Sequence, residues 1–110
     1  MPYVIVVIDE IADLMASSKK KTERFITMIA QKARAVGIHL IISTQKADKE
    51  FLTTTIKANM PTRVAFQARS TQDSMNALGE RGAEQLLPFG DMLISDAGRV
   101  PVRIHTPYLA

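Results

Sequence analysis

Cysteine and tryptophan are missing from this sequence of 110 residues, and histidine occurs only twice. Without cysteine the chain can form neither a disulfide framework nor a thiolate metal site. The two histidines, His39 and His105, are far apart in the sequence and lack the spacing of metal ligands. We therefore expect both of them to be structural residues.

Long apolar runs are absent as well. The opening run, Val4–Ile8, is far shorter than the ~20 residues that span a bilayer. Neither a basic n-region nor a small-residue cleavage site accompanies it, so it does not resemble a signal peptide. We expect a soluble, cytoplasmic chain. Its formal net charge of +3 fits a nucleic-acid partner, although many unrelated domains carry so small an excess.

Length and composition favour one small α/β domain. A chain of 110 residues is long enough for one small domain with a modest core but not for two domains. Hydrophobic residues make up 46% and charged residues 23%, which is ordinary for a soluble globular domain. Because Met1 and Pro2 stand directly in front of a core strand, we expect a fragment of a longer protein.

The most informative stretch is Val4–Ile8, which is followed at once by Asp9 and Glu10. Its β-branched residues show no polar alternation, which predicts a strand buried on both faces. In open parallel sheets ligands bind beyond the carboxyl ends of the strands, where these carboxylates would lie. An apolar strand that ends in Asp-Glu is the Walker B pattern of nucleotide-driven motors, in which the Asp helps to hold magnesium and the Glu activates water. An ordinary buried strand with an acidic end fits these residues equally well.

A helix and a second strand follow. Apolar residues recur at spacings of three and four through Thr22–Val36, which predicts a helix, and Gly37 suits its left-handed C-terminal cap. Ile38–Ser43 then predicts a second buried strand, so that strand, helix and strand form a right-handed parallel βαβ unit. Thr44 and Gln45 end this strand and are expected beside the two carboxylates. Polar groups that converge from two strand ends indicate a site more strongly than either end alone.

Before the helix at 22–36 we expect a helical turn at 11–15 and a polar loop at 17–21. After the second strand we expect a helix from an Asp48 cap to Ala58, a strand at 62–67 and a helix from a Ser70–Asp73 capping box to Leu78. A helical turn at 82–87 and a hairpin of 91–94 with 100–104 complete the expected elements. Pro101 makes the second arm of the hairpin an edge strand. We find no repeat or linker, so a single domain over residues 1–110 is predicted.

Five ordered segments then make the sequence specific: Val7–Leu14, Ala30–His39, Ser43–Gln45, Ile56–Gln67 and Gly90–Leu93. Together they resemble the motor domain of the FtsK/SpoIIIE family of DNA translocases, over nearly the whole chain. The resemblance implies part of a RecA-like P-loop NTPase core, with a mostly parallel sheet, flanking helices and a carboxyl-terminal β-hairpin. It also implies a hexameric ring that pumps double-stranded DNA with ATP and Mg²⁺ in chromosome partition.

The resemblance assigns roles to five residues. Asp9 would be the magnesium-associated Walker B Asp and Glu10 the catalytic Glu, while Thr44 and Gln45 match the segment that senses the γ-phosphate. Arg34 matches a residue that reaches into a neighbouring subunit's site as an arginine finger, which would make hydrolysis depend on assembly. An Arg near the end of a helix is also a favourable partner for the helix dipole, and this alternative stays open.

For DNA, the resemblance points to Lys46 and Lys57, with Arg69 as a partial substitute for basic positions that are neutral here, at Thr71 and Met75. Such phosphate contacts would give salt-dependent, sequence-tolerant binding. A solvated surface lysine is the alternative for each of the two lysines.

The largest departure from the family pattern is the absence of a phosphate-binding loop. No glycine of this sequence is followed by Lys, as a P-loop requires. In the family the P-loop strand lies between the strands at 38–43 and 62–67, and further segments provide a membrane anchor and a winged-helix module. We therefore expect the chain alone to be catalytically inactive, with unpaired strand edges that favour a dimer or strand-exchanged assembly. The alternative function is a non-enzymatic module that self-associates or binds DNA passively.

Overall fold

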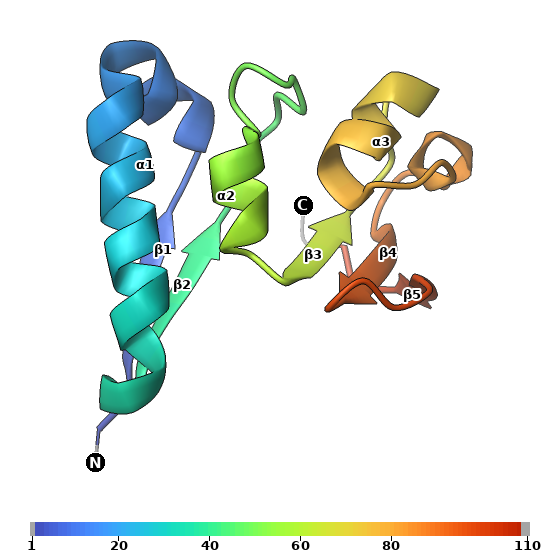
Figure 1. Cartoon of the computed structure of the whole chain (residues 1–110). Coiled ribbons are helices and arrows are strands. Elements are labelled where there is room, and N and C mark those ends of the chain that lie inside the picture. Colours follow the sequence, from blue (N-terminus) through green and yellow to red (C-terminus); the bar gives the residue numbers. More distant parts are fainter. Residues whose placement is uncertain (1, 109–110) are drawn as a thin grey trace. The chain divides into compact units, whose positions relative to one another are not determined.

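The computed structural model describes residues 2–108, with the side chain of Arg34 excepted (Figure 1). The chain divides into two units, a first unit that ends at Met60 and a second unit that begins at Pro61. Each unit has its own sheet, its own helices and its own core. That residues 1–110 form one partial motor domain stays a prediction.

The first unit is built on a parallel βαβ arrangement, as predicted. Strands β1 (Val4–Ile8) and β2 (Ile38–Ile42) pair in parallel with Val4 opposite Ile38, and helix α1 (Ile11–Val36) connects them (Figure 1). Gly37 ends the helix at a φ of 73°, and its N–H donates to the carbonyl of Ala33. That left-handed conformation disfavours a side chain, which explains the glycine.

Helix α1 continues where a polar loop at 17–21 is expected. The only non-helical residue inside it, within the described part of the chain, is Ser18 at φ −156° and ψ 76°. The expected loop is therefore wrong and is replaced by a kink at one residue. The lysines that follow are good helix formers, so the helix resumes directly after the kink.

Only one face of the parallel sheet is covered within the described residues. Ile8, Leu40 and Ile42 pack against a core of Ile11, Met15, Ile26 and Ile56. On the strands, Ile5 and Val7 are each 62% exposed and Ile41 is 52% exposed. Alternate side chains of a strand point to opposite faces, and α1 covers only one of them. The prediction that the opening strand is buried on both faces is therefore wrong for this chain.

Helix α2 (Thr54–Ala58) is shorter than expected and has a different cap. The hydroxyl of Thr53 accepts a hydrogen bond from the Ile56 N–H at 3.4 Å. Asp48 instead opens a separate turn, in which its backbone carbonyl accepts from the N–H groups of Phe51 and Leu52. The threonines at 53–55 explain the short helix, because Thr is a poor helix former and a good cap.

The second unit contains an antiparallel sheet. Strands β3 (Thr62–Ala65), β4 (Asp91–Asp96) and β5 (Val102–His105) lie in the order β3-β4-β5. The predicted hairpin is confirmed as β4 and β5, with β5 at the edge and Pro101 just before it. The expectation of a mostly parallel sheet is wrong, because β3 pairs antiparallel with β4 and does not join the sheet of β2.

One helix and one helical turn pack on this sheet. Helix α3 (Thr71–Leu78) begins at the predicted cap, since the Ser70 hydroxyl accepts from the Asp73 N–H at 3.2 Å. The core consists of Ala65, Leu78, Ala83 and Leu86, of which Ala83 starts a 3₁₀ turn, η1 (Ala83–Gln85). None of the helices in residues 2–108 has the length and hydropathy needed to cross a membrane.

Candidate functional site

The carboxyl ends of β1 and β2 are joined by two backbone hydrogen bonds. The Ser43 N–H donates to the Ile8 carbonyl at 3.0 Å, and the Ile11 N–H donates to the Ser43 carbonyl at 2.9 Å. The two residues between Ile8 and Ile11 are Asp9 and Glu10. Asp9 and Glu10 therefore lie just beyond the paired part of β1, beside the polar residues that follow β2 in the sequence.

Each carboxylate accepts hydrogen bonds from the end of β2. Ser43 Oγ donates to Asp9 Oδ1 at 3.0 Å. Thr44 Oγ1 donates to Glu10 Oε1 at 2.7 Å, and the Gln45 N–H donates to Glu10 Oε2, also at 2.7 Å. The predicted proximity of the two strand ends is therefore confirmed, whereas the catalytic roles stay a prediction.

Glu10 has a left-handed backbone conformation, with φ 58° and ψ 74°. For a residue with a side chain this conformation costs about 1–2 kcal/mol. Glu10 precedes α1, yet its side chain makes no capping bond to that helix. Its carboxylate is bound to β2 instead, so the strained backbone holds this group at the end of the sheet. Such strain is a feature of functional sites.

The charge of both carboxylates is not neutralised by a cation within the described residues. Neither Asp9 nor Glu10 takes part in an ion pair there; Asp9 is exposed and Glu10 is half-buried. Hydroxyl and amide donors bind the carboxylate oxygens but bring no positive charge to the site. An exposed carboxylate beside a hydroxyl offers the hard oxygen ligands that Mg²⁺ prefers.

A metal ion would need further ligands at this site. The described residues contain no group of three or more His, Cys, Asp or Glu side chains that could hold a metal by themselves. Mg²⁺ commonly takes one or two carboxylates and completes its shell with water and substrate phosphates. Asp9 therefore fits a magnesium ion that arrives with a phosphate ligand.

Thr44 lies at the centre of the hydrogen-bond network. Besides donating to Glu10, Thr44 Oγ1 accepts from the Lys46 N–H at 3.0 Å. The Lys46 ammonium nitrogen lies 5.9 Å from the centroid of the Phe51 ring, within the range of a cation–π contact. The first predicted DNA contact is thus two residues from a hydroxyl that holds the predicted catalytic Glu.

The other predicted residues are distributed over both units. Lys57 lies in the last turn of α2 and is half-buried, whereas Arg69 is exposed in the second unit, just before α3. Thr71 and Met75 are exposed residues of α3. Arg34 belongs to the last turns of α1, but its side chain lies outside the described part of the structure.

The sequence pattern missed two features. The sequence pattern gives Ser43 no role of its own, although Ser43 ends a predicted strand and its hydroxyl donates to Asp9. The second feature is the ion pair of Asp91 with Arg103, whose Nε lies 2.9 Å from Asp91 Oδ1. The Leu87 N–H donates to the same carboxylate at 2.8 Å. Hydrogen bonding from Arg103, and then from Leu87, lowers the pKa of Asp91 from 3.8 to about 2.

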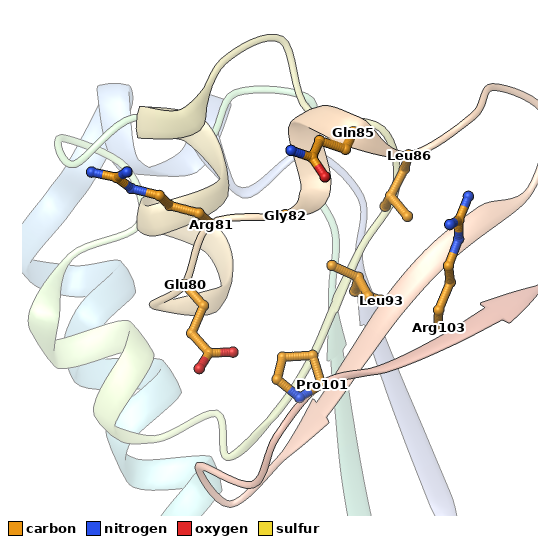
Figure 2. A pocket seen from close by; sticks show the side chains of 8 residues that line it. All are labelled: Glu80, Arg81, Gly82, Gln85, Leu86, Leu93, Pro101 and Arg103. Atoms are coloured by element: carbon orange, nitrogen blue, oxygen red, sulfur yellow. The ribbon is translucent and has the colours of Figure 1, made fainter.

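Arg103 also borders an open cavity of about 300 Å³ in the second unit (Figure 2). Leu86, Leu93 and Pro101 line it together with Glu80 and other residues of the same unit. None of the predicted site residues lines this cavity. The carboxylates at the end of the parallel sheet are therefore the stronger candidate site.

Comparison with known proteins shows which family the sequence matches. Residues 1–49 match the model of the FtsK/SpoIIIE family. The chain is 50% identical over 110 residues to the DNA translocase FtsK of Rhizobium meliloti and 51% identical to that of Caulobacter vibrioides, with all of the chain covered. It spans only 12% and 13% of the length of these two relatives.

Two solved structures share the fold. The conjugation coupling protein TcpA of pCW3, in a monomer form with ATPγS, superposes with a TM-score of 0.87 at 28% identity, over 98% of this chain and 33% of TcpA. The cytoplasmic domain of the type VII secretion ATPase EccC from Thermomonospora curvata gives 0.87 at 25% identity, over 98% and 12%. The fold therefore matches part of FtsK-like ATPase structures. The chain belongs to the FtsK/SpoIIIE family.

Proposed function

We propose that this chain supplies hydrolytic residues to an ATP-driven motor that moves double-stranded DNA in chromosome partition. The observation that carries the proposal is the pair of carboxylates at the end of β1, each bound by a residue at the end of β2. Identity of 50% to a DNA translocase supports it as well. The motor would act as a hexameric ring, and its other parts would come from segments beyond these 110 residues.

Asp9 and Glu10 have different roles in this proposal. Asp9 would hold Mg²⁺, which supplies positive charge to the phosphates of ATP. Glu10 would orient the attacking water and accept its proton at a carboxylate oxygen, since the bonds from Thr44 and Gln45 fix the orientation of the carboxylate. Thr44 and Gln45 would respond to the γ-phosphate, and Arg34 would serve the site of a neighbouring subunit.

Lys46, Lys57 and Arg69 would contact DNA phosphates. Contacts of this kind lack sequence preference and weaken steeply as salt increases. Fluorescence anisotropy with duplex DNA at several salt concentrations tests the assignment. We expect weaker binding from Lys46→Met than from Lys49→Met, a matched change at an exposed lysine with no proposed role. Equal affinities would remove Lys46 from the proposed DNA contact.

The chain alone should not turn over ATP, because no glycine in it is followed by the Lys of a P-loop. We expect negligible hydrolysis and at best weak binding of magnesium nucleotide. Isothermal titration that detects micromolar affinity for ATP would contradict this expectation. The chain would act only inside a complete motor, which we expect to be cytoplasmic and anchored to the membrane by another segment.

A chimera provides the direct test of the function. This chain replaces the matching segment in the DNA translocase FtsK of Rhizobium meliloti, and ATP hydrolysis is measured with and without DNA. We expect the chimera to hydrolyse ATP and Glu10→Gln to lower turnover by roughly 10²–10⁴-fold, as loss of a general base does. Asp13→Asn, an exposed carboxylate nearby, is the matched control and should retain activity. Full activity of Glu10→Gln would refute the assigned role.

A second candidate function is self-association, and the exposed apolar face of the first unit favours it. Ile5, Val7 and Ile41 present contiguous apolar surface on a two-stranded sheet. A second copy of the chain could cover this surface or pair with an open strand edge. Light scattering should give a dimer mass that falls in Val7→Thr/Ile41→Thr but not in Val100→Thr, an exposed valine of the second unit. A monomer mass at high protein concentration would exclude this candidate.

A further inference from the structure

We infer that the Thr44 hydroxyl is a positioning group which couples contact with a nucleic-acid phosphate at Lys46 to the orientation of the Glu10 carboxylate. The inference rests on the proposed function, because it takes Lys46 as a DNA contact and Glu10 as the catalytic base. The inference adds a specific link between Lys46 and Glu10, namely one hydroxyl group with two possible acceptors.

The first step of the argument is the number of protons on Thr44 Oγ1. A hydroxyl carries one proton and can donate to one acceptor at a time. Two acceptors lie within reach, Glu10 Oε1 at 2.7 Å and the Lys46 carbonyl at 3.3 Å. The shorter distance and the negative charge favour Glu10 in this structure. Donation to the Lys46 carbonyl would withdraw the hydrogen bond from Glu10.

The second step is that the backbone of Lys46 controls this choice. Its N–H donates to Thr44 Oγ1 at 3.0 Å, and its carbonyl is the competing acceptor. Both polar groups of one residue therefore surround the same hydroxyl. Regular pairing with β1 ends at Ser43, so residues 44–46 are not held by a strand ladder. A small rotation of the Lys46 backbone would bring the hydroxyl from one acceptor to the other.

The third step is the position of the Lys46 side chain. Its ammonium group lies over the ring of Phe51, which packs against the core of the first unit. The rest of Lys46 is exposed. A phosphate group that binds the ammonium competes with this cation–π contact and removes the tether between Lys46 and the core. The backbone beside Thr44 is then free to adopt the alternative arrangement.

The fourth step is that Glu10 responds to the loss of a hydrogen bond. Its backbone is in the left-handed region, which a residue with a side chain occupies only when other contacts hold it there. Among the described residues those contacts are the side-chain bonds from Thr44 and Gln45 and the bond from the Asp13 N–H to the Glu10 carbonyl at 3.2 Å. Withdrawal of the Thr44 bond frees one carboxylate oxygen, which then points to water or substrate. DNA contact would thereby change the state of the catalytic group.

Nuclear magnetic resonance on the full chain tests the coupling. The probe is a short duplex DNA of mixed sequence, and the readouts are the carboxyl carbon shift of Glu10 and the hydrogen exchange of the Gln45 amide. We expect DNA to shift the Glu10 signal in the unmodified chain and in Thr44→Ser, which retains the hydroxyl. Thr44→Val has a similar shape but no hydroxyl, and the DNA-induced shift should be lost while DNA affinity, measured by anisotropy, is unchanged.

The outcomes separate the inference from the function on which it rests. If DNA binds but moves the Glu10 signal equally in Thr44→Val, or does not move it in the unmodified chain, the coupling is wrong and the DNA role stands. If no DNA binds at any salt concentration, the DNA role fails and the coupling fails with it. Unchanged amide signals of β1 and β2 establish that Thr44→Val is folded, and Thr44→Ala serves as a second variant without the hydroxyl. An equal shift in Thr44→Ala would also refute the coupling.

Discussion

Asp91 in the second unit and the pair Asp9 and Glu10 in the first unit have opposite environments. In the second unit Asp91 is only 3% exposed and is paired with Arg103, and the Leu87 N–H adds a further bond. In the first unit Asp9 is exposed and Glu10 half-buried, and hydroxyl and amide donors bind them without a cation among the described residues. Each of these carboxylates accepts a hydrogen bond, but Asp9 and Glu10, unlike Asp91, have no cation beside them among the described residues.

The difference separates a structural carboxylate from one that can do chemistry. Arg103 lies on β5 and Asp91 on β4, so their ion pair links the two strands of the hairpin and occupies both carboxylate oxygens of Asp91. The carboxylates of β1 lie beyond the sheet, where a cation or a water molecule can reach them. The conformational strain at Glu10 has no counterpart in Asp91, whose φ is not positive. We expect substitutions in the two units to differ accordingly.

The largest effect is expected in the core of the first unit. Ile26 is 0% exposed, so Ile26→Ala should lower the free energy of unfolding by about 2–5 kcal/mol. Ile41→Ala is the matched control, because Ile41 is 52% exposed and its loss should cost about 0.5 kcal/mol or less. Urea denaturation followed by circular dichroism measures both. A large loss in Ile41→Ala would indicate that another molecule covers this face.

The core of the first unit also illustrates what the sequence predicts well. The apolar spacing in 22–36 and the β-branched runs at 4–8 and 38–43 depend on local periodicity, and the βαβ arrangement follows from them. The proximity of Asp9 and Glu10 to Thr44 and Gln45 follows in turn, because parallel strands end at the same edge. Burial of a second sheet face is different, since it depends on a layer that the described residues do not provide.

Non-local pairing explains most of what the sequence does not predict. Periodicity identifies β3, but whether it pairs with β2 or β4 depends on which strands are present to compete for its edge. The pairing of Asp91 with Arg103 needs the register of the hairpin, in which Arg103 stands opposite Leu93. The sequence favours Asp48 as the cap of α2 and the structure uses Thr53, because Asp and Thr are both good N-caps.

The next prediction concerns the ion pair of the second unit. The folded pKa of Asp91 is about 2 and lies below the ordinary value of 3.8, so its contribution to stability is complete above pH 4 and is lost as the pH falls toward 2. Asp91→Asn should lower the melting temperature at pH 7 by several degrees and remove that part of the acid dependence. Thermal unfolding at pH 7 and pH 2.5 measures it. Asp96→Asn, which changes a carboxylate bonded to the Thr62 hydroxyl, should change both much less.

The strain at Glu10 gives a prediction whose sign can be tested. At φ 58° glycine is favoured over alanine, so Glu10→Gly should be more stable than Glu10→Ala by about 1–2 kcal/mol. Both variants lose the same hydrogen bonds, so the difference reports the backbone alone. At Asp13, in the first turn of α1, the order should reverse, with glycine less stable than alanine by about 1 kcal/mol. Chemical denaturation of the four variants decides it, and alanine as the more stable residue at both positions would refute the strain.

The smallest effects are expected at the two helix caps, one in each unit. Ser70→Ala removes the bond to the Asp73 N–H and should cost about 1 kcal/mol. Thr53 has a longer capping bond, at 3.4 Å, but its hydroxyl also donates to Glu23 Oε2 at 2.9 Å, which ties α2 to α1. Thr53→Ala should therefore cost at least as much as Ser70→Ala, and Thr53→Ser should recover most of the loss. If Thr53→Ser is as unstable as Thr53→Ala, the threonine methyl group rather than its hydroxyl stabilises this end of the first unit.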